Sequence, residues 1–255
     1  MSKKSAERSR AQRAQDAMQA QQRQERRRQM LVVGGIVVAI VAIVGTLFAV
    51  NAMRDTTGES ESSVPQASSS EGPGGAAVDG YTVTVGEASA PTTIALYEDL
   101  QCPVCAVFES MTGDAVRQAI DDGKVKVEYH MVAFLDDAST TDYSSRALNA
   151  LMVVLDTAGT EAYLDYHELL YANQPAEGTA GLTDDQLIEY AVEAGADEDA
   201  VRGPIEDNQF HQWVVNATDQ MSQDGVNGTP TAFIDGKQAG ANPQEAAEAV
   251  LDAVQ

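Results

Sequence analysis

The chain of 255 residues contains only two cysteines and three histidines. A domain stapled by several disulfides would scatter more cysteines along its length, so that class of fold is excluded. A structural zinc site needs four ligands, and His130, His167 and His211 show no paired ligand spacing, so they are predicted to be surface or partly satisfied core residues. A phosphate-binding loop, a dinucleotide fingerprint, a Ser-His-Asp order and an internal repeat are also missing. We therefore predict an activity that uses no metal and no cofactor.

Basic residues are scarce beyond the first 30 positions. The chain holds 16 Lys and Arg against 39 Asp and Glu, yet nine of the 16 fall in residues 1–30 beside only three acids. Such a segment could be a nucleic-acid tail. Basic residues directly before an apolar run are more typical of membrane orientation signals, so we predict a cytoplasmic segment and no nucleic-acid binding.

Residues 31–50 lack any charged side chain and are almost all Val, Ile, Ala, Leu and Gly. Their length is about that of a segment that spans a bilayer. A cleaved signal peptide would have a shorter apolar region and a better cleavage site than residues 50–52 provide, and a buried core helix would be apolar on one stripe only. We predict a single-pass anchor in the cell membrane, with residues 1–30 in the cytoplasm and the rest of the chain outside.

Large apolar side chains are also rare in residues 51–80, which are rich in Ser, Gly, Glu and Pro. This composition predicts a disordered linker. A linker of this kind has a root-mean-square reach of roughly 30 Å. It would hold the outer domain near the membrane without fixing it there.

Residues 81–255 alternate between strand and helix patterns. Strands are predicted at 81–85, 92–97, 124–131 and 231–234, the last followed by a hairpin turn at Asp235-Gly236. Helices are predicted from the cysteines to residue 122, and after Asn242, which caps a helix with Pro243 at its first position. The order predicts an α/β fold of three layers.

A helical insertion is predicted at about residues 141–223. One segment ends at Gly159, and a second covers residues 161–171. A third opens with a capping box at residues 183–186. A fourth passes through Ile205, Phe210 and Trp213. The tyrosines of the second segment, at positions 163, 166 and 171, are predicted to pack in a core.

Both cysteines lie in one run, Cys102-Pro103-Val104-Cys105, between a predicted strand and a predicted helix. The unpaired N–H groups and the positive dipole end of a helix stabilise a thiolate, so we expect a lowered pKa for Cys102. Pro103 suits the first turn, where its missing N–H is not needed. We predict Cys102 as the exposed attacking sulfur and Cys105 as the shielded resolving sulfur. An inert disulfide is the alternative, but closing so short a loop removes little unfolded-state entropy.

Two runs carry a family resemblance: residues 97–105, YEDLQCPVC, and residues 228–236, GTPTAFIDG. Together they resemble the membrane-anchored DsbA-like thiol–disulfide oxidoreductases of the thioredoxin superfamily, of the Gram-positive or actinobacterial type, over residues 81–255. The resemblance implies a thioredoxin-like fold with a helical insertion. It also implies that Thr229 and Pro230 form a cis peptide facing the cysteines, with Pro103 and Val104 as supporting residues. The implied activity is disulfide formation in exported cysteine-containing proteins, with a DsbB-like or vitamin K epoxide reductase-like membrane partner.

The chain departs from the family pattern at two places. The strongest oxidases have Pro-His between the cysteines, whereas this chain has Pro103-Val104. The buried acid that relatives carry six residues before the first cysteine is replaced by Leu96. Glu98 or Asp99 could replace it as proton acceptor for Cys105, although we interpret both as solvated loop acids. Two alternatives stay open: a tethered reductase, for example in cytochrome maturation, and a non-catalytic binding or chaperone module.

Overall fold

The structure, a computed structural model, describes residue 65 and residues 75–255. The predicted basic segment, the predicted membrane span and most of the predicted linker lie outside these residues, so these three remain predictions. Within the part of the chain that the structure describes, no helix is both long enough and apolar enough to cross a membrane.

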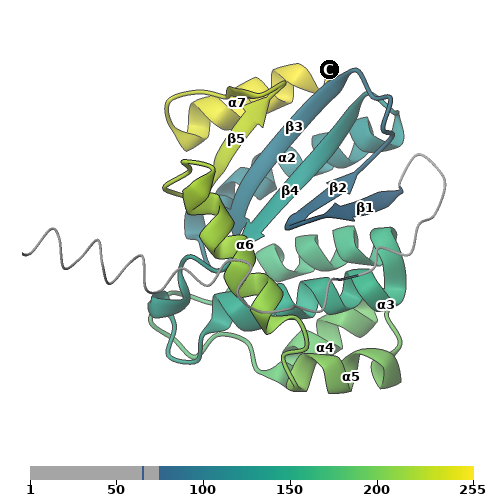
Figure 1. The fold of residues 1–255 in the computed structure, drawn as a ribbon, viewed down its shortest axis with the longest axis vertical. Coiled ribbons are helices and arrows are strands. Elements are labelled where there is room, and N and C mark those ends of the chain that lie inside the picture. The colour runs from purple at the N-terminus through teal and green to yellow at the C-terminus, as the bar shows by residue number, and fades with distance from the viewer. Residues whose placement is uncertain (1–64, 66–74) are drawn as a thin grey trace, which may run out of the picture. The chain divides into compact units, whose positions relative to one another are not determined.

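Six strands form one mixed sheet in the order β1-β2-β4-β3-β5-β6 (Figure 1). Their bounds are β1 Ala76–Asp79, β2 Thr82–Val85, β3 Thr92–Asp99, β4 Val125–Val132, β5 Thr231–Ile234 and β6 Lys237–Gln238. The central pair, β3 and β4, is parallel, and the other four pairings of this sheet are antiparallel. A parallel pair needs a crossover connection, which α2 supplies.

The helices of the described residues are α2 Pro103–Asp121, α3 Tyr143–Ala172, α4 Asp184–Glu193, α5 Glu198–Glu206, α6 His211–Gln223 and α7 Pro243–Ala253, with a short 3-10 turn at Asp136–Ala138. α2 packs against α7 and α3, α6 packs on β4, and α4 and α5 pack on α3. Figure 1 shows α2 behind the sheet and α6 in front of it, so the sheet is the middle of three layers.

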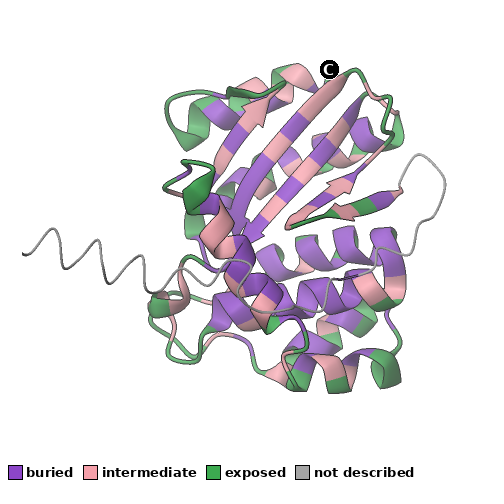
Figure 2. Cartoon of the chain, viewed as in Figure 1, coloured by how far each residue is buried: buried purple, intermediate pink, exposed green. Residues whose placement is uncertain are grey.

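Strand β3 is covered on both faces near its carboxyl end, where all residues from Leu96 to Asp99 are buried (Figure 2). Successive side chains of a strand point to opposite faces. Tyr97 points toward α6 and donates a hydrogen bond of 2.9 Å to Asp224. Glu98 therefore points to the opposite face, toward α2 and α3.

The sheet begins inside the segment predicted as linker. Strand β1 pairs with β2 from Ala76 opposite Val85 to Asp79 opposite Thr82. Its sequence, Ala-Ala-Val-Asp, carries almost no strand signal by itself, and its pairing with β2 makes it a strand. The predicted linker is therefore too long by these four residues.

The helical insertion is confirmed with one correction. Gly159, with φ of 85°, separates two parts of α3 that match the first two predicted segments. The capping box at Thr183 is present, and Asn242 caps α7. The predicted fourth segment is two helices, α5 and α6. The chain breaks between them at Asn208, with φ of 50°, and the Phe210 N–H leaves the helical pattern to donate to Asn149.

Candidate active site

Cys102 and Cys105 lie at the start of α2. Cys102 is the N-cap residue, Pro103 follows at the first helical position, and Cys105 lies in the first turn. Both thiols are free, Cys105 is fully buried, and Cys102 is only 5% exposed. The prediction of an exposed Cys102 is therefore wrong. Cys102 is the more accessible of the two, but the loop that contains Thr229 lies against its sulfur.

The two thiols differ in acidity. The hydrogen bond from the Cys105 thiol is the largest of the effects that lower the pKa of Cys102 to about 6. Hydrogen bonds from the Thr229 side chain and from the backbone N–H groups of Cys105 and Val104 lower it further, while burial opposes them. Burial, the same hydrogen bond and the charge of Glu98 raise the pKa of Cys105 well above its ordinary value. At neutral pH, Cys102 is therefore mostly thiolate and Cys105 is a thiol.

The Thr229–Pro230 peptide is cis, as the family resemblance implied. In its protonated form the Cys102 thiol donates a hydrogen bond of 3.4 Å to the backbone carbonyl of Thr229, which places this loop directly against the attacking sulfur. Pro230 is buried, whereas Pro103 and Val104 are exposed, Val104 by 45%. A cysteine-containing peptide that approaches Cys102 would meet the residues on both sides of it.

A loop after α3 holds the turn between β3 and α2. The side-chain amide of Gln174 donates to the carbonyls of Leu100, at 2.9 Å, and Cys102, at 3.0 Å. In the opposite direction, the Gln101 side chain donates to the carbonyl of Pro175 at 3.1 Å. The helical insertion therefore helps to position the first cysteine.

Glu98 and Asp99 are not solvated loop acids, so that interpretation is wrong. Both belong to β3 and both are fully buried. Strand β3 continues through them, in parallel register with Met131 and Val132 of β4. Sequence periodicity did not separate two acids at the end of a central strand from two acids in a loop.

Asp99 is saturated with hydrogen bonds. Its Oδ1 accepts from the Gln101 N–H at 2.8 Å and from the Ser144 hydroxyl at 2.7 Å, and its Oδ2 accepts from the Leu135 N–H at 2.8 Å. Burial raises its pKa to about 6, although all three hydrogen bonds oppose the shift. Asp99 ties together the active-site turn, α3 and the segment after β4.

Glu98 is equally buried but has no such partners. Neither of its carboxylate oxygens has a hydrogen-bond partner among the described residues, and burial raises its pKa to about 8. Its Oε2 lies 3.3 Å from Nε2 of His167, and Nδ1 of the same ring lies 3.9 Å from Oε2 of Glu109. The pKa of Glu109 is also raised to about 8, chiefly by burial and then by the charge of Glu98. The two carboxyl groups share a hydrogen bond when one of them carries a proton.

Glu109 and His167 are the members of this cluster that the sequence analysis missed. His167 is a buried residue between two carboxyl groups, not a surface residue. Two spacings could have indicated the cluster. Glu109 is four residues after Cys105 on the same helix face, and His167 is four residues from both Tyr163 and Tyr171 on α3.

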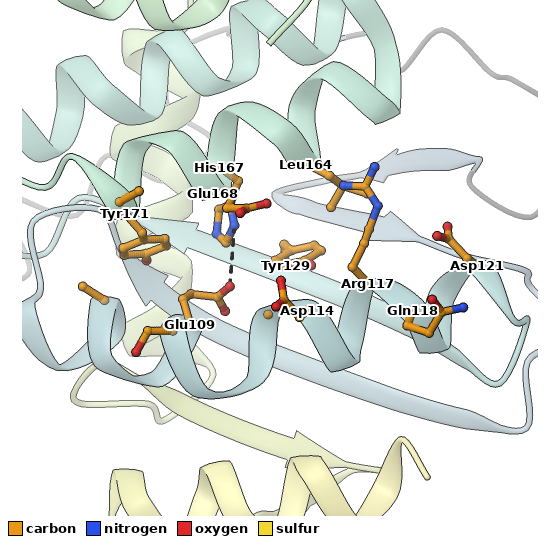
Figure 3. A pocket seen from close by; sticks show the side chains of 14 residues that line it. Glu109, Asp114, Arg117, Gln118, Asp121, Tyr129, Leu164, His167, Glu168 and Tyr171 are labelled. Carbon is orange, nitrogen blue, oxygen red and sulfur yellow. Dashed lines mark ion pairs between the residues drawn. The ribbon is translucent and has the colours of Figure 1, made fainter. Parts of the chain in front are cut away.

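A groove of about 570 Å³ opens between α2 and α3 beside this cluster (Figure 3). Glu109, His167, Tyr129 and Tyr171 line its inner part, and Figure 3 shows the Glu109 carboxylate of α2 pointing across to the His167 ring of α3. Neither cysteine lines the groove. Within the described residues, no group of three or more His, Cys, Asp or Glu side chains is arranged to hold a metal ion.

This geometry places a nucleophilic thiolate, a protonated partner thiol and a buried carboxyl group of near-neutral pKa together at the end of β3. A thiolate attacks disulfides, and the partner thiol closes or opens the internal disulfide. The carboxyl group can exchange a proton with that partner. A mixed sheet, a dithiol at a helix N-terminus and a cis-proline loop beside it define a thioredoxin-like thiol–disulfide oxidoreductase.

The chain belongs to the thioredoxin family, whose family model, described as "Thioredoxin", matches residues 79–253. Within that family it is DsbA-like. The reduced form of the disulfide bond oxidoreductase DsbG from Mycobacterium tuberculosis is 33% identical, over 64% of this chain and 78% of that one, with a TM-score of 0.55. Oxidised DsbA of the same organism is 31% identical, over 67% of this chain and 88% of that one, also with a TM-score of 0.55.

One of the curated relatives is much longer than the part of it that matches this chain. The serine/threonine-protein kinase PknE of Mycobacterium tuberculosis is 30% identical over 155 residues, which are 58% of this chain and 27% of the kinase. The chain therefore spans less than a third of the length of the curated relatives it matches. The similarity to the kinase is confined to those 155 residues.

Proposed function

We propose that this protein is an extracytoplasmic oxidase that forms disulfides in exported proteins through its Cys102–Cys105 pair. The observation that carries the proposal is the opposite acidity of the two thiols in the reduced form. A pKa of about 6 at Cys102 stabilises the reduced form at neutral pH. A cysteine pair whose reduced form is stabilised is a stronger oxidant, because its disulfide is more easily reduced and its reduction potential is higher.

The reaction proceeds in two exchanges. A client thiolate attacks Sγ of Cys102 in the disulfide, a client–Cys102 mixed disulfide forms, and Cys105 leaves with the bonding electron pair and takes a proton. A second client thiolate then attacks the client sulfur of the mixed disulfide, and Cys102 leaves as a thiolate. The client loses two electrons and the Cys102–Cys105 pair gains them. Glu98, protonated at neutral pH because its pKa is about 8, supplies the proton to Cys105.

Location and partners follow from the sequence and remain part of the proposal. The apolar residues 31–50 would anchor the domain outside the cytoplasm, where exported cysteine-containing proteins fold. A DsbB-like or vitamin K epoxide reductase-like membrane enzyme would reoxidise the pair. An anchored domain on a linker can reach such a partner in the plane of the membrane.

The reduction potential of the full chain in glutathione buffers tests the direction of the reaction. We expect a value well above that of the glutathione couple. A value near that of thioredoxin, about −270 mV, would contradict the oxidase proposal and favour the tethered reductase. The Cys102→Ser variant, which cannot form the disulfide, provides the baseline.

A trapping experiment separates an enzyme from a passive binding module. The Cys105→Ser variant lacks the resolving thiol, so we expect it to accumulate mixed disulfides between Cys102 and exported proteins. The matched variant with both cysteines replaced by serine should trap none. Absence of mixed disulfides from the first variant would favour the non-catalytic alternative.

A further inference from the structure

Four polar atoms without hydrogen-bond partners lie together in the core beside the active site. They are both carboxylate oxygens of Glu98, Nε2 of His167 and the hydroxyl of Tyr163. Buried polar atoms are normally paired, and an unpaired set carries a free-energy penalty that packing must offset. Asp99, one residue away, shows that this fold can satisfy a buried carboxylate completely. The unpaired set at Glu98 therefore needs a functional explanation.

The cluster reaches from the sulfurs to the surface. Glu98 has no exposed surface, and its charge acts on Cys105 at the inner end of the cluster. The His167 ring is the next group, 3.3 Å from Glu98 and 4% exposed at its side chain. Glu109 lies 3.9 Å from the other ring nitrogen and is 15% exposed, at the wall of the groove between α2 and α3. Exposure thus increases step by step away from Cys105.

The neighbouring groups restrict which atoms can pass a proton. The titratable side chains that interact electrostatically with Glu98, His167 or Glu109 are Cys102 and Cys105 at the start of α2, Tyr129 of β4, and Tyr163, Glu168 and Tyr171 of α3. Burial raises the pKa values of the three tyrosines well above their ordinary value, so they stay protonated. Asp99 is held by its three hydrogen bonds on the opposite face of β3.

We propose that His167 and Glu109 are positioning residues that connect Glu98 to solvent in the groove between α2 and α3, so that the proton of Cys105 enters and leaves by this route. The route does not cross the surface around Thr229 and Pro230, because none of the groove-lining residues belongs to that loop. A bound client would cover Cys102 and still leave the proton path open. The inference rests on thiol–disulfide exchange at Cys102 and Cys105 but not on its direction.

The proton balance is the same in both directions. When the internal disulfide opens, the leaving Cys105 sulfur takes a proton from Glu98, and the ionised Glu98 regains one from solvent through His167 and Glu109. When the disulfide closes, Glu98 first releases its proton to the groove through His167 and Glu109. Its carboxylate then accepts the proton of the Cys105 thiol, the Cys105 sulfur attacks Sγ of Cys102, and the thiolate bound to Cys102 leaves. One proton crosses the path in each half-cycle, and no further oxidant or reductant is needed.

Oxidised glutathione and the reduced full chain provide the test, with each step followed by acid quenching and mass spectrometry. In the first step the Cys102 thiolate forms a mixed disulfide, and in the second step Cys105 loses its proton and releases glutathione. We expect Glu109→Gln and His167→Gln to slow the second step roughly 10-fold or more near neutral pH and to change its pH profile. The first step should stay within about twofold of the wild type, because it needs no proton from Cys105.

Asp114→Asn is the matched control. Asp114 lines the same groove on α2, is exposed, and forms no hydrogen bond or ion pair with Glu98 or His167, so this variant also replaces a carboxyl group by an amide in the groove but does not interrupt the path. Its second step should equal that of the wild type. For His167→Ala, added imidazole should restore the second step, because a small base can enter through the groove; a merely structural role would show no such rescue.

Two results would overturn the proposal. The second step could stay within about twofold of the wild type in both variants across the pH range from about 5 to 9. Alternatively, both steps could slow together, which would mean a general disturbance of the site. A wild-type chain that forms no mixed disulfide at all would instead refute the proposed function, and the proton path with it.

Discussion

Glu98 and Asp99 are consecutive in the sequence and fully buried, but they lie on opposite faces of β3. Asp99 accepts three hydrogen bonds that hold the active-site turn, the start of α3 and the segment after β4. Glu98 accepts no hydrogen bond from a backbone N–H or a hydroxyl and lies instead against His167 and a second carboxyl group, Glu109, with which it can share a proton. Two buried carboxyl groups therefore have different roles, one structural and one reactive. Their hydrogen-bond partners, and not the extent of their burial, distinguish the two.

The comparison shows how a structural acid and a reactive acid can be separated in this family of folds. Hydrogen bonds to a buried carboxylate stabilise its charged form, so the three at Asp99 hold its pKa below the value that burial alone would give. A carboxylate without donors is held near neutral pKa and can exchange a proton with a neighbouring thiol. Replacing Asp99 should therefore affect the stability of the fold, and replacing Glu98 should affect the pH dependence of stability.

Asp99→Ala should have the largest effect on stability. The change leaves three donors, two N–H groups and the Ser144 hydroxyl, without partners in or near the core, so we expect a loss of unfolding free energy on the order of 4 kcal/mol. Urea unfolding followed by the fluorescence of Trp213, the one tryptophan of the chain, measures it. The control is Asp137→Ala, at an exposed acid of the nearby 3-10 turn. Equal stabilities for the two variants would contradict the structural role of Asp99.

Glu98→Gln should change the pH dependence of stability. The pKa of Glu98 is raised to about 8, so the folded state binds a proton that the unfolded state releases near its ordinary pKa. Stability of the wild type therefore falls as pH rises from about 4.5 to about 8. The variant lacks this contribution and should exceed the wild type by on the order of 2 kcal/mol at the upper end of that window. The measurement is urea unfolding of the reduced protein at a series of pH values. If the stability of the variant and of the wild type changed with pH in parallel, the prediction would be wrong.

Ser144→Ala should have a smaller effect on the Asp99 side. It removes one of three hydrogen bonds to a buried carboxylate, so the expected loss is about 1–2 kcal/mol. The pKa of Asp99 should rise further from about 6, since the Ser144 hydrogen bond lowers it. Thermal unfolding at acidic and neutral pH reports both changes. Glutathione exchange kinetics of the folded variant should match the wild type.

The smallest effect is expected at Cys102. Its pKa of about 6 arises chiefly from hydrogen bonds with the Cys105 thiol, the Thr229 side chain and the backbone N–H groups at the N-terminus of α2. The charge of Cys102 is the smallest of the effects that shift the pKa values of Glu98 and Asp99, so these carboxyl groups interact only weakly with Cys102. Glu98→Gln and Asp99→Asn should therefore each move the Cys102 pKa by less than about half a unit. The pH dependence of alkylation by iodoacetamide measures this pKa. A larger shift in either variant would mean that the carboxylates tune the nucleophile and not only the Cys105 proton.

Local sequence signals predicted much of the fold and half of the site. The dithiol at a helix start, the Thr229–Pro230 turn and the caps at Thr183 and Asn242 depend on residues close together in the chain, and the structure contains each of them. Strand β1 and the break before α6 were missed. The first depends on pairing with β2, and the second on a hydrogen bond from Phe210 to Asn149, far away in the sequence.

The sequence by itself determined that two cysteines would share one helix N-terminus, because three-residue spacing and a strand-to-helix transition are local properties. Only the tertiary structure decided which acid would be reactive. Glu98, Glu109 and His167 come from three different elements, β3, α2 and α3, and their meeting depends on how α2 and α3 pack against each other and against the sheet at β4. Burial removes water from these groups and shifts their pKa values, and no pattern along the chain reports where water is excluded.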